Sequence, residues 1–431
     1  MKKCLIIGGG LAGLTAASIL SSKNYSVTVL ESSPKLGGRA YSFKDPESNS
    51  DIDNGQHILM GCYRETLSFL KLTGAENNFS YQKYLGLSFL SDERIIYRLK
   101  ADRFLYPFNL LLAVTGYNAL TPGEKIRFIS FVIKLPLISK RDLANQNAGN
   151  WLRLNHQSFN TTKMFWEILC AAALNTSLDK ASALLFHTVL LEIFFTGNRS
   201  STIILPKKGL TESIIEPAEN FIKKNNGIII KSETVKKFII KNGLIVSVQS
   251  QNFSIDDYDY VISAVPLFSL QKISGYKDLG LKSELEYSAI VNVHIWSEDI
   301  LINQNFMGFL NSPLHWIFRK DNHYNIVISD ADYLVDKTNT EIYNFVIMEL
   351  SKFINFDPAD IKSFKVVKEK RATFVPSGSA LKQRPGTITN VKNLFLAGDW
   401  LDTGLPATIE SAVKSGSMAA ESILKRDHGH E

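Results

Sequence analysis

The chain has 431 residues, of which 45% are hydrophobic and 21% are charged, and its net charge is +6. This balance is that of a folded globular protein, and it excludes an intrinsically disordered chain, a collagen-like fibre and a disulfide-stapled miniprotein. The length predicts two or three domains. Because the basic residues are dispersed, we predict no nucleic-acid partner, whereas the net charge is compatible with an anionic membrane surface.

The cysteines and the longest uncharged run restrict the class of protein further. Cys4, Cys62 and Cys170 form no paired spacing, which predicts reduced thiols, a cytoplasmic location and no metal site. The longest uncharged run, residues 104–123, contains Pro107, and its apolar parts are shorter than the ~20 residues that span a bilayer. We therefore predict no transmembrane helix.

Residues 3–31 form the first predicted unit. A short apolar strand over residues 4–7 is followed by a glycine-rich turn, an alanine-rich helix to about Ser21, and a β-branched strand that ends at Glu31. The change from a short apolar run to a helical stretch and back to a strand predicts a β-turn-α-β unit.

Gly8, Gly10 and Gly13 satisfy G-x-G-x-x-G directly after a strand and at the start of a helix. Gly8 allows the tight turn, Gly10 lets the backbone approach a pyrophosphate, and Gly13 lets helix and strand pack closely. Free N–H groups at the helix start bind the phosphates. Glu31 follows Gly13 by eighteen residues, where its carboxylate accepts hydrogen bonds from ribose hydroxyls and repels a 2′-phosphate. The unit therefore predicts a dinucleotide site.

A second pair of glycines, Gly37 and Gly38, precedes Arg39 just downstream. Beside a dinucleotide site, this group predicts a second clamp on the same cofactor, in which Arg39 counters the pyrophosphate charge. The alternative is a surface turn with a solvated arginine. A nicotinamide site would not need this motif.

The remaining segments differ in character. Residues 75–204 are predicted to be mostly helical and are unusually apolar, and residues 267–385 are predicted to be mixed α/β. Between them, residues 226–266 alternate apolar and polar positions through Asn-Gly and charged turns, which predicts a β-meander. Near the C-terminus, an apolar strand and a loop precede a helix that begins after Pro406, as helix starts prefer.

The glycine loop, the Gly-Gly-Arg group and the C-terminal LAGD-to-helix segment occur in the order typical of the flavin-dependent amine oxidase and carotenoid desaturase superfamily, which the chain resembles. The resemblance implies an α/β fold, with an FAD-binding Rossmann-like domain made from discontinuous segments and a mixed α+β substrate domain. On this basis, residues 1–74, 205–266 and 386–431 form the FAD-binding domain. Residues 75–204 and 267–385 form the substrate domain.

The same resemblance implies which residues bind FAD. The C-terminal helix points its N-terminus at the flavin ring, where it stabilises the negative charge of reduced flavin. The implied residues are Gly8, Gly10, Leu11, Ala12 and Gly13 at the pyrophosphate, Glu31 at the adenosine ribose, Gly37, Gly38 and Arg39 near the phosphates, Val235 at the adenine, Gly398 and Asp399 at the ribityl or pyrophosphate region, Ala407, Thr408 and Ile409 at the flavin ring, and His57, Ile58 and Tyr63 in the segment DNGQHILMGCY.

Within the superfamily, the segments DNGQH, EKRATF and GDWLDTGLPATIE most resemble the hydroxysqualene dehydroxylase family of bacterial hopanoid synthesis. That resemblance implies removal of the hydroxyl of hydroxysqualene, with hydride from reduced FAD, to give squalene. The implied substrate is a hydrophobic C30 isoprenoid. Because the chain has only one dinucleotide fingerprint, no built-in NAD(P)H site is predicted and an external electron donor must reduce the FAD.

Two alternatives remain open. A carotenoid desaturase of the phytoene type would run the redox step in the other direction, and the predicted cofactor site does not separate the two activities. A non-enzymatic prenyl-lipid-binding protein, as in Rab GDP-dissociation inhibitors, shares the scaffold without FAD. The intact Gly-Gly-Arg clamp and Asp399 argue against that second alternative.

Departure of hydroxide requires a proton donor near the flavin. His57, Asp53 and Asp402 lie in segments expected there, and we rank His57 first, although a histidine at this position also fits a role in holding flavin. Arg371 either orients the leaving hydroxyl or pairs with a carboxylate. The delocalised cation expected from an allylic C–O bond is stabilised by aromatic faces. Candidate wall residues, with ordinary aromatic core as the alternative, are Trp296, Trp316 and Phe318.

The C30 isoprenoid substrate that the resemblance implies would reside in the bilayer, and this would give the apolar segments 104–116 and 126–138 a role. We predict that they dip into the inner face of the cytoplasmic membrane as a peripheral anchor and open a tunnel to the flavin. The same segments are also compatible with buried core helices of the substrate domain. The basic residues that flank them are Lys100, Arg103, Lys125, Arg127, Lys134, Lys140 and Arg141.

Overall fold

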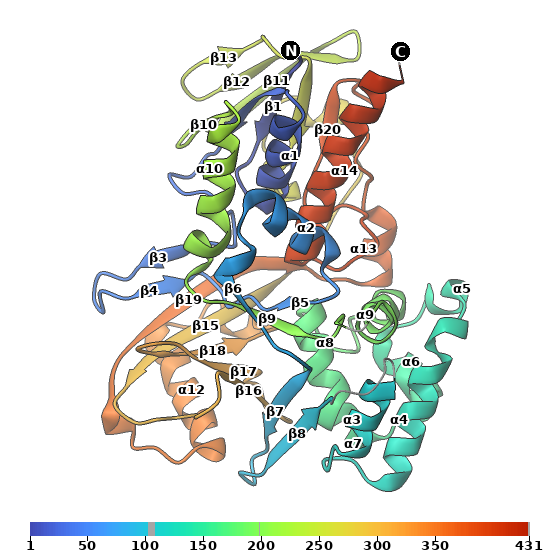
Figure 1. Cartoon of the computed structure of the whole chain (residues 1–431), viewed down its shortest axis with the longest axis vertical. Coiled ribbons are helices and arrows are strands. Elements are labelled where there is room, and N and C mark those ends of the chain that lie inside the picture. The colour runs from blue at the N-terminus through green and yellow to red at the C-terminus, as the bar shows by residue number, and fades with distance from the viewer. Residues whose placement is uncertain (102–107, 198, 430–431) are drawn as a thin grey trace.

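The computed structural model describes residues 1–101, 108–197 and 199–429. Arg103 and the first residues of the predicted membrane segment 104–116 lie outside this part of the chain. Both termini lie at one end of the molecule, and the described parts of residues 86–195 and 287–374 build most of the other end (Figure 1).

The end that holds the termini is built on a parallel sheet of five short strands. Its order is β10 (Ile228–Ile230), β2 (Ser26–Leu30), β1 (Lys3–Ile7), β14 (Tyr260–Ser263) and β20 (Leu394–Leu396). Neighbouring strands pair in parallel throughout. All five strands come from the three segments predicted to form the FAD-binding domain, so the chain returns twice to this sheet.

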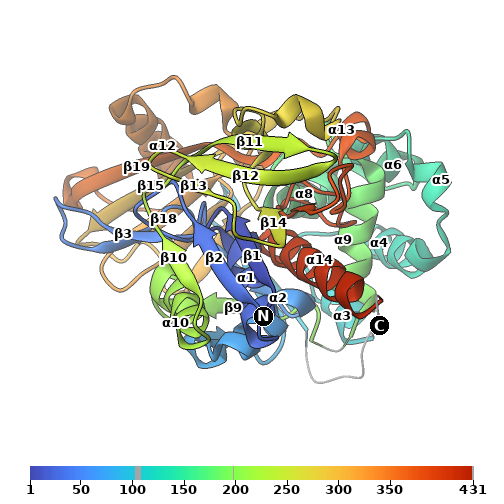
Figure 2. The same cartoon turned by 90° about the horizontal axis from the view of Figure 1, so that it is seen from above.

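The two faces of the parallel sheet are covered differently, because strand residues alternate between them. Cys4 and Ile6 belong to a buried cluster with three helices, whereas Leu5 and Ile7 belong to a cluster with a second, antiparallel sheet. The helices are α1 (Leu11–Ser22), α10 (Glu216–Lys224) and α14 (Ile409–His428), and the antiparallel strands are β11 (Val235–Lys241), β12 (Leu244–Ser250) and β13 (Ser254–Ile255). Figure 2 shows α14 beside α1. The predicted meander over residues 226–266 is therefore right for β11 to β13, whereas β10 and β14 join the parallel sheet.

Seven strands form the main sheet of the other end, and they come from two distant stretches of chain. The order is β19 (Ile361–Phe374), β15 (Tyr287–Ser297), β18 (Tyr324–Ile328), β17 (Trp316–Arg319), β16 (Phe306–Phe309), β7 (Gly86–Leu90) and β8 (Ile96–Lys100). Neighbours are antiparallel except β16 and β7. One face packs against α12 (Asn339–Phe353), and Val293, Ile326 and Val346 lie in that core.

The opposite face of the seven-stranded sheet meets a group of helices. These are α3 (Phe108–Thr115), α4 (Pro122–Lys134), α5 (Lys140–Leu143), α6 (Ala148–Leu154), α7 (Phe159–Thr161), α8 (Glu167–Leu174) and α9 (Ala183–Phe195). Their buried side chains form one cluster with Trp316, Phe318 and Val327 of the sheet. The helical prediction for residues 75–204 is right for this stretch, but it misses β6 (Phe79–Tyr81), β7 and β8. Pairing of β7 with the distant β16 is invisible to local periodicity.

The remaining elements connect these parts. They are β3 (Ser42–Lys44), β4 (Asp51–Asp53), β5 (Leu59–Met60), α2 (Arg64–Thr73), β9 (Ile203–Pro206), α11 (Leu267–Leu270) and α13 (Gly378–Gln383). Short 3₁₀-helices lie at Glu76–Asn78, Leu135–Leu137, Tyr276–Leu279, Asp332–Leu334 and Pro358–Asp360. Two π-helical turns lie at Thr162–Trp166 and Thr211–Ile215. Within the described part of the chain, none of the helices has the length and apolar character needed to cross a bilayer.

Candidate active site

One cavity of about 930 Å³ runs from the glycine loop before α1 to the helices of the other end. Residues at the carboxyl ends of β1, β2 and β14, the start of β11, the start of α14, the seven-stranded sheet and helices α3, α8 and α9 line it. A crevice beyond the carboxyl ends of parallel strands is where open α/β sheets bind dinucleotides.

The glycine loop has the geometry that its residue types require. Gly8 has a φ of +106°, in the left-handed region that favours glycine. A Cβ at Gly13 would lie 2.0 Å from the Gly8 carbonyl oxygen, so α1 and β1 touch backbone to backbone there. Gly10 is the N-cap of α1, and an added Cβ there would meet nothing nearer than the Gly38 Cα at 3.9 Å. The start of α1 is therefore open to the cavity.

The carboxylate of Glu31, just after β2, is buried and lines the cavity. Its Oε2 accepts a hydrogen bond from the Gly9 N–H at 2.6 Å, and its Oε1 accepts one from the Ser33 N–H at 2.7 Å. Glu31 therefore fixes the glycine loop to the chain after β2, in addition to presenting an acceptor to the cavity. This anchoring role was not predicted from the sequence.

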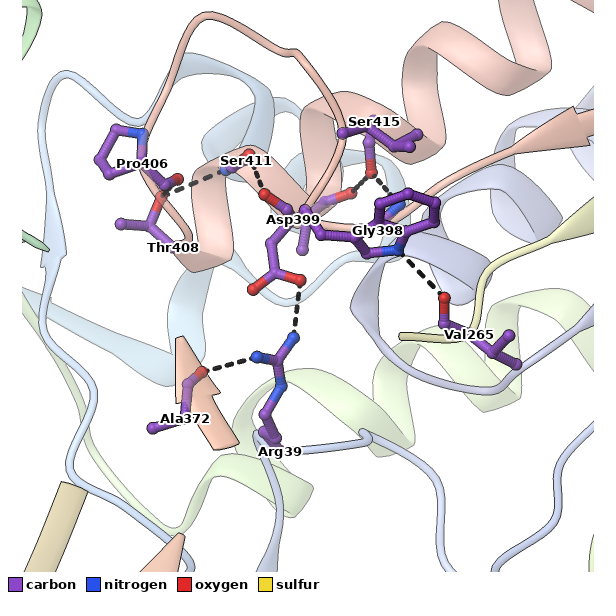
Figure 3. Close-up of polar contacts among 12 residues, drawn as sticks. Arg39, Val265, Ala372, Gly398, Asp399, Pro406, Thr408, Ser411 and Ser415 are labelled. Atoms are coloured by element: carbon purple, nitrogen blue, oxygen red, sulfur yellow. Dashed lines mark hydrogen bonds and ion pairs between the residues drawn. The ribbon is translucent and has the colours of Figure 1, made fainter. Parts of the chain in front are cut away.

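Arg39 and Asp399 form an ion pair in the cavity wall. Arg39 Nη2 donates to Asp399 Oδ1 at 2.7 Å, and Nη1 donates to the Ala372 carbonyl at 2.6 Å (Figure 3). Burial disfavours the charged guanidinium, but the adjacent Asp399 carboxylate raises the pKa of Arg39. The pair connects the Gly-Gly-Arg group to the C-terminal segment and to β19.

The loop before α14 is held by hydrogen bonds to the helix it precedes. The Gly398 N–H donates to Ser415 Oγ at 2.7 Å, and Gly398 itself has a φ of +146°. Thr408 is the N-cap, and its Oγ1 accepts from the Ser411 N–H at 3.2 Å (Figure 3). Residues 407–409 line the cavity, so the partial positive charge of the helix start faces it.

The other part of the cavity is apolar and lies within the helical end of the molecule. Its wall includes Leu110, Phe165, Leu169, Ile193, Trp316 and Phe318. These side chains come from α3, α8, α9, β17 and the turn before α8. This part of the cavity suits a long hydrocarbon and excludes water from it.

Polar side chains adjoin the apolar wall. Asn292 and Ile290 are alternate residues of β15, so they share one face of the sheet, and both line the cavity. His57 and Arg371 line it as well. Burial lowers the pKa of His57, and the positive charges of Arg39 and Lys320 lower it further against the opposing effect of Asp53. His57 is therefore held as the neutral imidazole near neutral pH.

A family model described as flavin containing amine oxidoreductase matches residues 11–424. The chain belongs to this family. The match begins at the first residue of α1, just after Gly10, and ends within α14, so it covers both ends of the molecule.

Two curated relatives and one solved structure extend the comparison. The hydroxysqualene dehydroxylase of Zymomonas mobilis is 29% identical, over 97% of this chain and 98% of its own. The 15-cis-phytoene desaturase of Synechococcus elongatus is 22% identical, over 98% of this chain and 95% of its own. The solved structure of an oxidoreductase from Methanosarcina mazei matches 97% of this chain and all of its own, with a TM-score of 0.73 and 17% identity. That structural match shows the shared fold.

The residues present fit FAD, the cofactor of this flavoprotein family. The missing side chain of Gly10 leaves the start of α1 accessible, and backbone N–H groups there suit a pyrophosphate. The Glu31 carboxylate is an acceptor for ribose hydroxyls, and the N-terminus of α14 suits the electron-rich part of a flavin. FAD is therefore the cofactor, and the protein is an FAD-dependent oxidoreductase.

The structure brings the predicted cofactor residues together, with one exception. Gly13 lies behind the loop and acts only in the packing of α1 on β1. The residues that line the cavity are Gly8, Gly10, Leu11, Ala12, Glu31, Gly37, Gly38, Arg39, His57, Ile58, Tyr63, Val235, Gly398, Asp399, Ala407, Thr408 and Ile409.

The predicted catalytic residues divide into two groups. His57 and Arg371 line the cavity, and the Arg371 guanidinium lies 4.4 Å from the ring centre of Phe268. Asp53 does not line it, since its Oδ1 accepts from Ser42 Oγ at 2.7 Å and its Oδ2 pairs with Lys320 at 3.4 Å. Asp402 also does not, because it is exposed and accepts from the Gly404 N–H in its own turn. Of the predicted wall residues, Trp316 and Phe318 line the cavity and Trp296 does not.

Several polar wall residues were missed by the sequence analysis. They include Asn175, Asn292 and Thr373. A signal existed for Asn292, because β15 reads YSAIVNVHIWS and places Asn292 and His294 among buried apolar residues. Two polar residues spaced by two in a buried strand indicate a polar face.

Proposed function

We propose that the chain removes the hydroxyl of hydroxysqualene and gives squalene. Hydroxysqualene dehydroxylases of Zymomonas mobilis and two further bacteria, 27–29% identical over 97–98% of the chain, support the proposal. The observation that carries it is the composition of the cavity, in which a polar wall with His57 and Asn292 adjoins a water-excluding apolar wall. A long isoprenoid with a single hydroxyl has the same division.

In this proposal the cavity residues act on an allylic C–O bond. Bound reduced FAD supplies hydride to the carbon. The oxygen leaves with the electron pair of its bond and takes a proton, so hydroxysqualene, hydride and one proton give squalene and water. The π faces of Trp316 and Phe318 stabilise positive charge on the allyl group, and the apolar wall excludes water. His57 passes the proton to the oxygen, and Arg371 orients the oxygen.

The test is an anaerobic reaction of the purified protein with its FAD reduced by dithionite. Addition of hydroxysqualene in detergent should yield squalene by gas chromatography, together with the return of the oxidised flavin band. Reduced free FAD without protein is the control. The proposal fails if the flavin stays reduced and no squalene forms.

The second candidate function is a phytoene-type desaturase. The similarity to the Synechococcus phytoene desaturase supports it, and the apolar cavity suits that hydrocarbon equally well. A parallel reaction with phytoene, oxidised FAD and a quinone acceptor decides between the two. Conjugated products with visible absorbance, and no squalene from hydroxysqualene, would favour the desaturase.

A non-enzymatic prenyl-lipid-binding protein is the least favoured candidate. A protein that binds no FAD would not need an unobstructed helix start at Gly10 or the ion pair between Arg39 and Asp399. This chain has both features. Purified protein that binds a prenyl lipid without any flavin absorbance would support that role instead.

We further propose that the protein binds the inner face of the cytoplasmic membrane peripherally through α3 and α4, and that an external donor reduces its FAD. These helices pack against each other. Leu110 and Val114 of α3 line the cavity, whereas Phe108 and Leu112 of the same helix are exposed. The exposed apolar residues are Phe108, Leu112, Ile126, Ile133 and Leu137, and nearby basic residues are Lys125, Arg127, Lys134, Lys140 and Arg141. One helix thus joins a lipid-facing surface to the substrate cavity.

A further inference from the structure

A buried polar surface continues from the cavity along the seven-stranded sheet. Asn292, His294 and Trp296 alternate along β15 and share one face. His294 lies opposite Asn325 of β18 in the register, and His323 precedes β18. His294 and Asn325 have no exposed surface, and His323 is buried as well.

Several side chains of this surface, together with the neighbouring Gln56, carry polar atoms for which the described residues offer no hydrogen-bond partner. The atoms are Gln56 Oε1, Asn292 Nδ2, His294 Nδ1, His294 Nε2, His323 Nε2 and Asn325 Oδ1. Buried polar atoms in native proteins are paired with protein or with ordered water. Several unpaired atoms on one continuous surface therefore point to internal water that links them.

The inner end of this surface reaches the cavity. Asn292 Oδ1 accepts from Asn325 Nδ2 at 3.2 Å and from the Gln56 N–H at 3.4 Å. A Cβ placed on Gly55 would lie 3.5 Å from Asn292 Nδ2 and 3.8 Å from His57 Nε2. Asn292, Gln56 and His57 all line the cavity, so the polar surface ends beside the proposed proton donor.

The outer end of the surface reaches solvent. The rings of His294 and His323 lie 5.1 Å apart between centres, and Trp296 stacks on His323 at 5.1 Å. His323 Nδ1 contacts Asn322 Oδ1 at 2.9 Å, and Asn322 is exposed. A continuous series of polar groups therefore connects solvent at Asn322 with the cavity at His57.

We propose that His294 and His323, together with internal water, relay a proton from solvent to His57 and the departing hydroxyl. The inference rests on the proposed function, because dehydroxylation consumes one proton for each hydride that reaches carbon. That proton goes to the leaving oxygen, which departs as water with the electrons of the C–O bond. Each imidazole accepts a proton at one ring nitrogen and releases one from the other, so neither is consumed.

The charges that face the two histidines are consistent with a neutral relay. Burial first, and then His323 and Lys320, lower the pKa of His294 to about 3, while the backbone of Asp53 and the charge of Asp45 oppose the shift. Burial first, and then Lys320, lower the pKa of His323 to about 4, while Asp53 and Asp321 oppose the shift. Both rings are neutral near neutral pH, as is His57. None of these three imidazoles holds an extra proton before the reaction, so in this proposal the proton reaches them from solvent during turnover.

The test compares three variants in a single turnover. His294→Gln removes the ring nitrogens of the inner relay residue and retains hydrogen-bonding groups. His323→Ala opens the outer position next to the exposed Asn322. His187→Gln is the matched control, because His187 is a buried histidine of α9 that does not line the cavity. Dithionite-reduced holoenzyme is mixed with hydroxysqualene in H₂O and in D₂O, and flavin reoxidation and squalene are followed.

We expect wild type and His187→Gln to react at similar rates that fall in D₂O. His294→Gln and His323→Ala should be slower by at least about tenfold, with normal FAD spectra and substrate affinity. Added imidazole should restore His323→Ala, whereas pyrrole, which fills the same space without a basic nitrogen, should not. Wild-type rates in both variants, or equal rescue by pyrrole, would overturn the relay alone. Absence of squalene with the wild-type enzyme would overturn the proposed function and the relay with it.

Discussion

Arg39 and Asp399 are 360 positions apart in the sequence, and their side chains meet through a 2.7 Å contact between Arg39 Nη2 and Asp399 Oδ1. Arg39 also donates to the Ala372 carbonyl of β19. The contact therefore ties the N-terminal βαβ unit, the seven-stranded sheet and the start of α14 around the FAD cavity. The cavity wall is therefore built from this long-range contact as well as from the local glycine loop.

Loss of the Arg39–Asp399 ion pair should weaken FAD binding. Asp399→Asn leaves the partly buried Arg39 without its counter-charge, which costs about 1.5–3 kcal/mol. The dissociation constant for FAD should rise by roughly tenfold to a hundredfold, measured by titration of apoprotein. Glu212→Gln, which breaks the exposed pair with Lys208, is the control and should bind FAD normally. Unchanged affinity in Asp399→Asn would show that the pair does not order the cavity.

Gly13 should tolerate no side chain, although it does not line the cavity. In Gly13→Ala the added Cβ would lie 2.0 Å from the Gly8 carbonyl oxygen, and α1 would have to move away from β1. Overpacking of this kind costs about 1–3 kcal/mol or more. Thermal unfolding should shift to lower temperature and FAD content should fall. Gly386→Ala, where an added Cβ meets nothing within 4 Å, should behave like wild type.

The glycine loop and the Arg39–Asp399 ion pair show which parts of the site could be predicted from the sequence and which could not. Gly8 and Gly13 were informative because a positive φ and a close backbone approach favour glycine there, and Gly10 because its missing side chain leaves the start of α1 open to the cavity. The partner of Arg39 could not be read, because a contact across 360 positions depends on the folded chain. Sequence proximity to the flavin segment was also misleading for Asp402, whose side chain turns back to the Gly404 N–H.

Strands of the seven-stranded sheet were predicted less well, because their pairing and burial also depend on distant parts of the chain. Strands β7 and β8 are short and only partly buried, and pairing with β16 stabilises them. The polar face of β15 went unnoticed because a strand with one polar face and one apolar face looks like a surface strand. In the fold, both faces of β15 are buried, because Asn292 and His294 on the polar face are as inaccessible to solvent as Val291 and Val293 on the apolar face.

Stability should depend on pH through the buried histidines. The pKa of His294 is about 3 in the folded protein and about 6.5 in an unfolded chain. The unfolded state therefore binds more protons between these values, and stability is full above pH 6.5 and falls as the pH decreases. From pH 7 to pH 5 the loss is about 2 kcal/mol for this group. Urea unfolding of wild type and His294→Gln at both pH values should show a smaller loss in the variant, and equal losses would contradict the assignment.

Removal of the His57 imidazole should slow the chemical step and leave FAD in place. His57→Ala loses the group that passes the proton to the departing oxygen, and such groups contribute about a hundredfold or more to rate. Single-turnover flavin reoxidation measures that step, and the flavin spectrum and FAD dissociation constant measure cofactor binding. His187→Gln, at a buried histidine that does not line the cavity, is the control. Loss of FAD at an unchanged rate per bound flavin would identify His57 as a cofactor ligand only.

Membrane binding should depend on the exposed apolar residues of α3 and α4. Leu112→Glu and Ile126→Glu replace exposed side chains in these helices, and each should weaken binding to vesicles by about tenfold, since a buried leucine or isoleucine contributes roughly 1.5–3 kcal/mol. Sedimentation with vesicles of phosphatidylglycerol and phosphatidylcholine measures the binding. Met348→Glu, an exposed apolar position of α12, is the control. Because the basic residues beside these helices act through charge, binding of wild type should weaken with added salt and with purely zwitterionic vesicles. Equal sedimentation of all variants would leave α3 as part of the cavity wall and α4 as a core helix, with no role at a membrane.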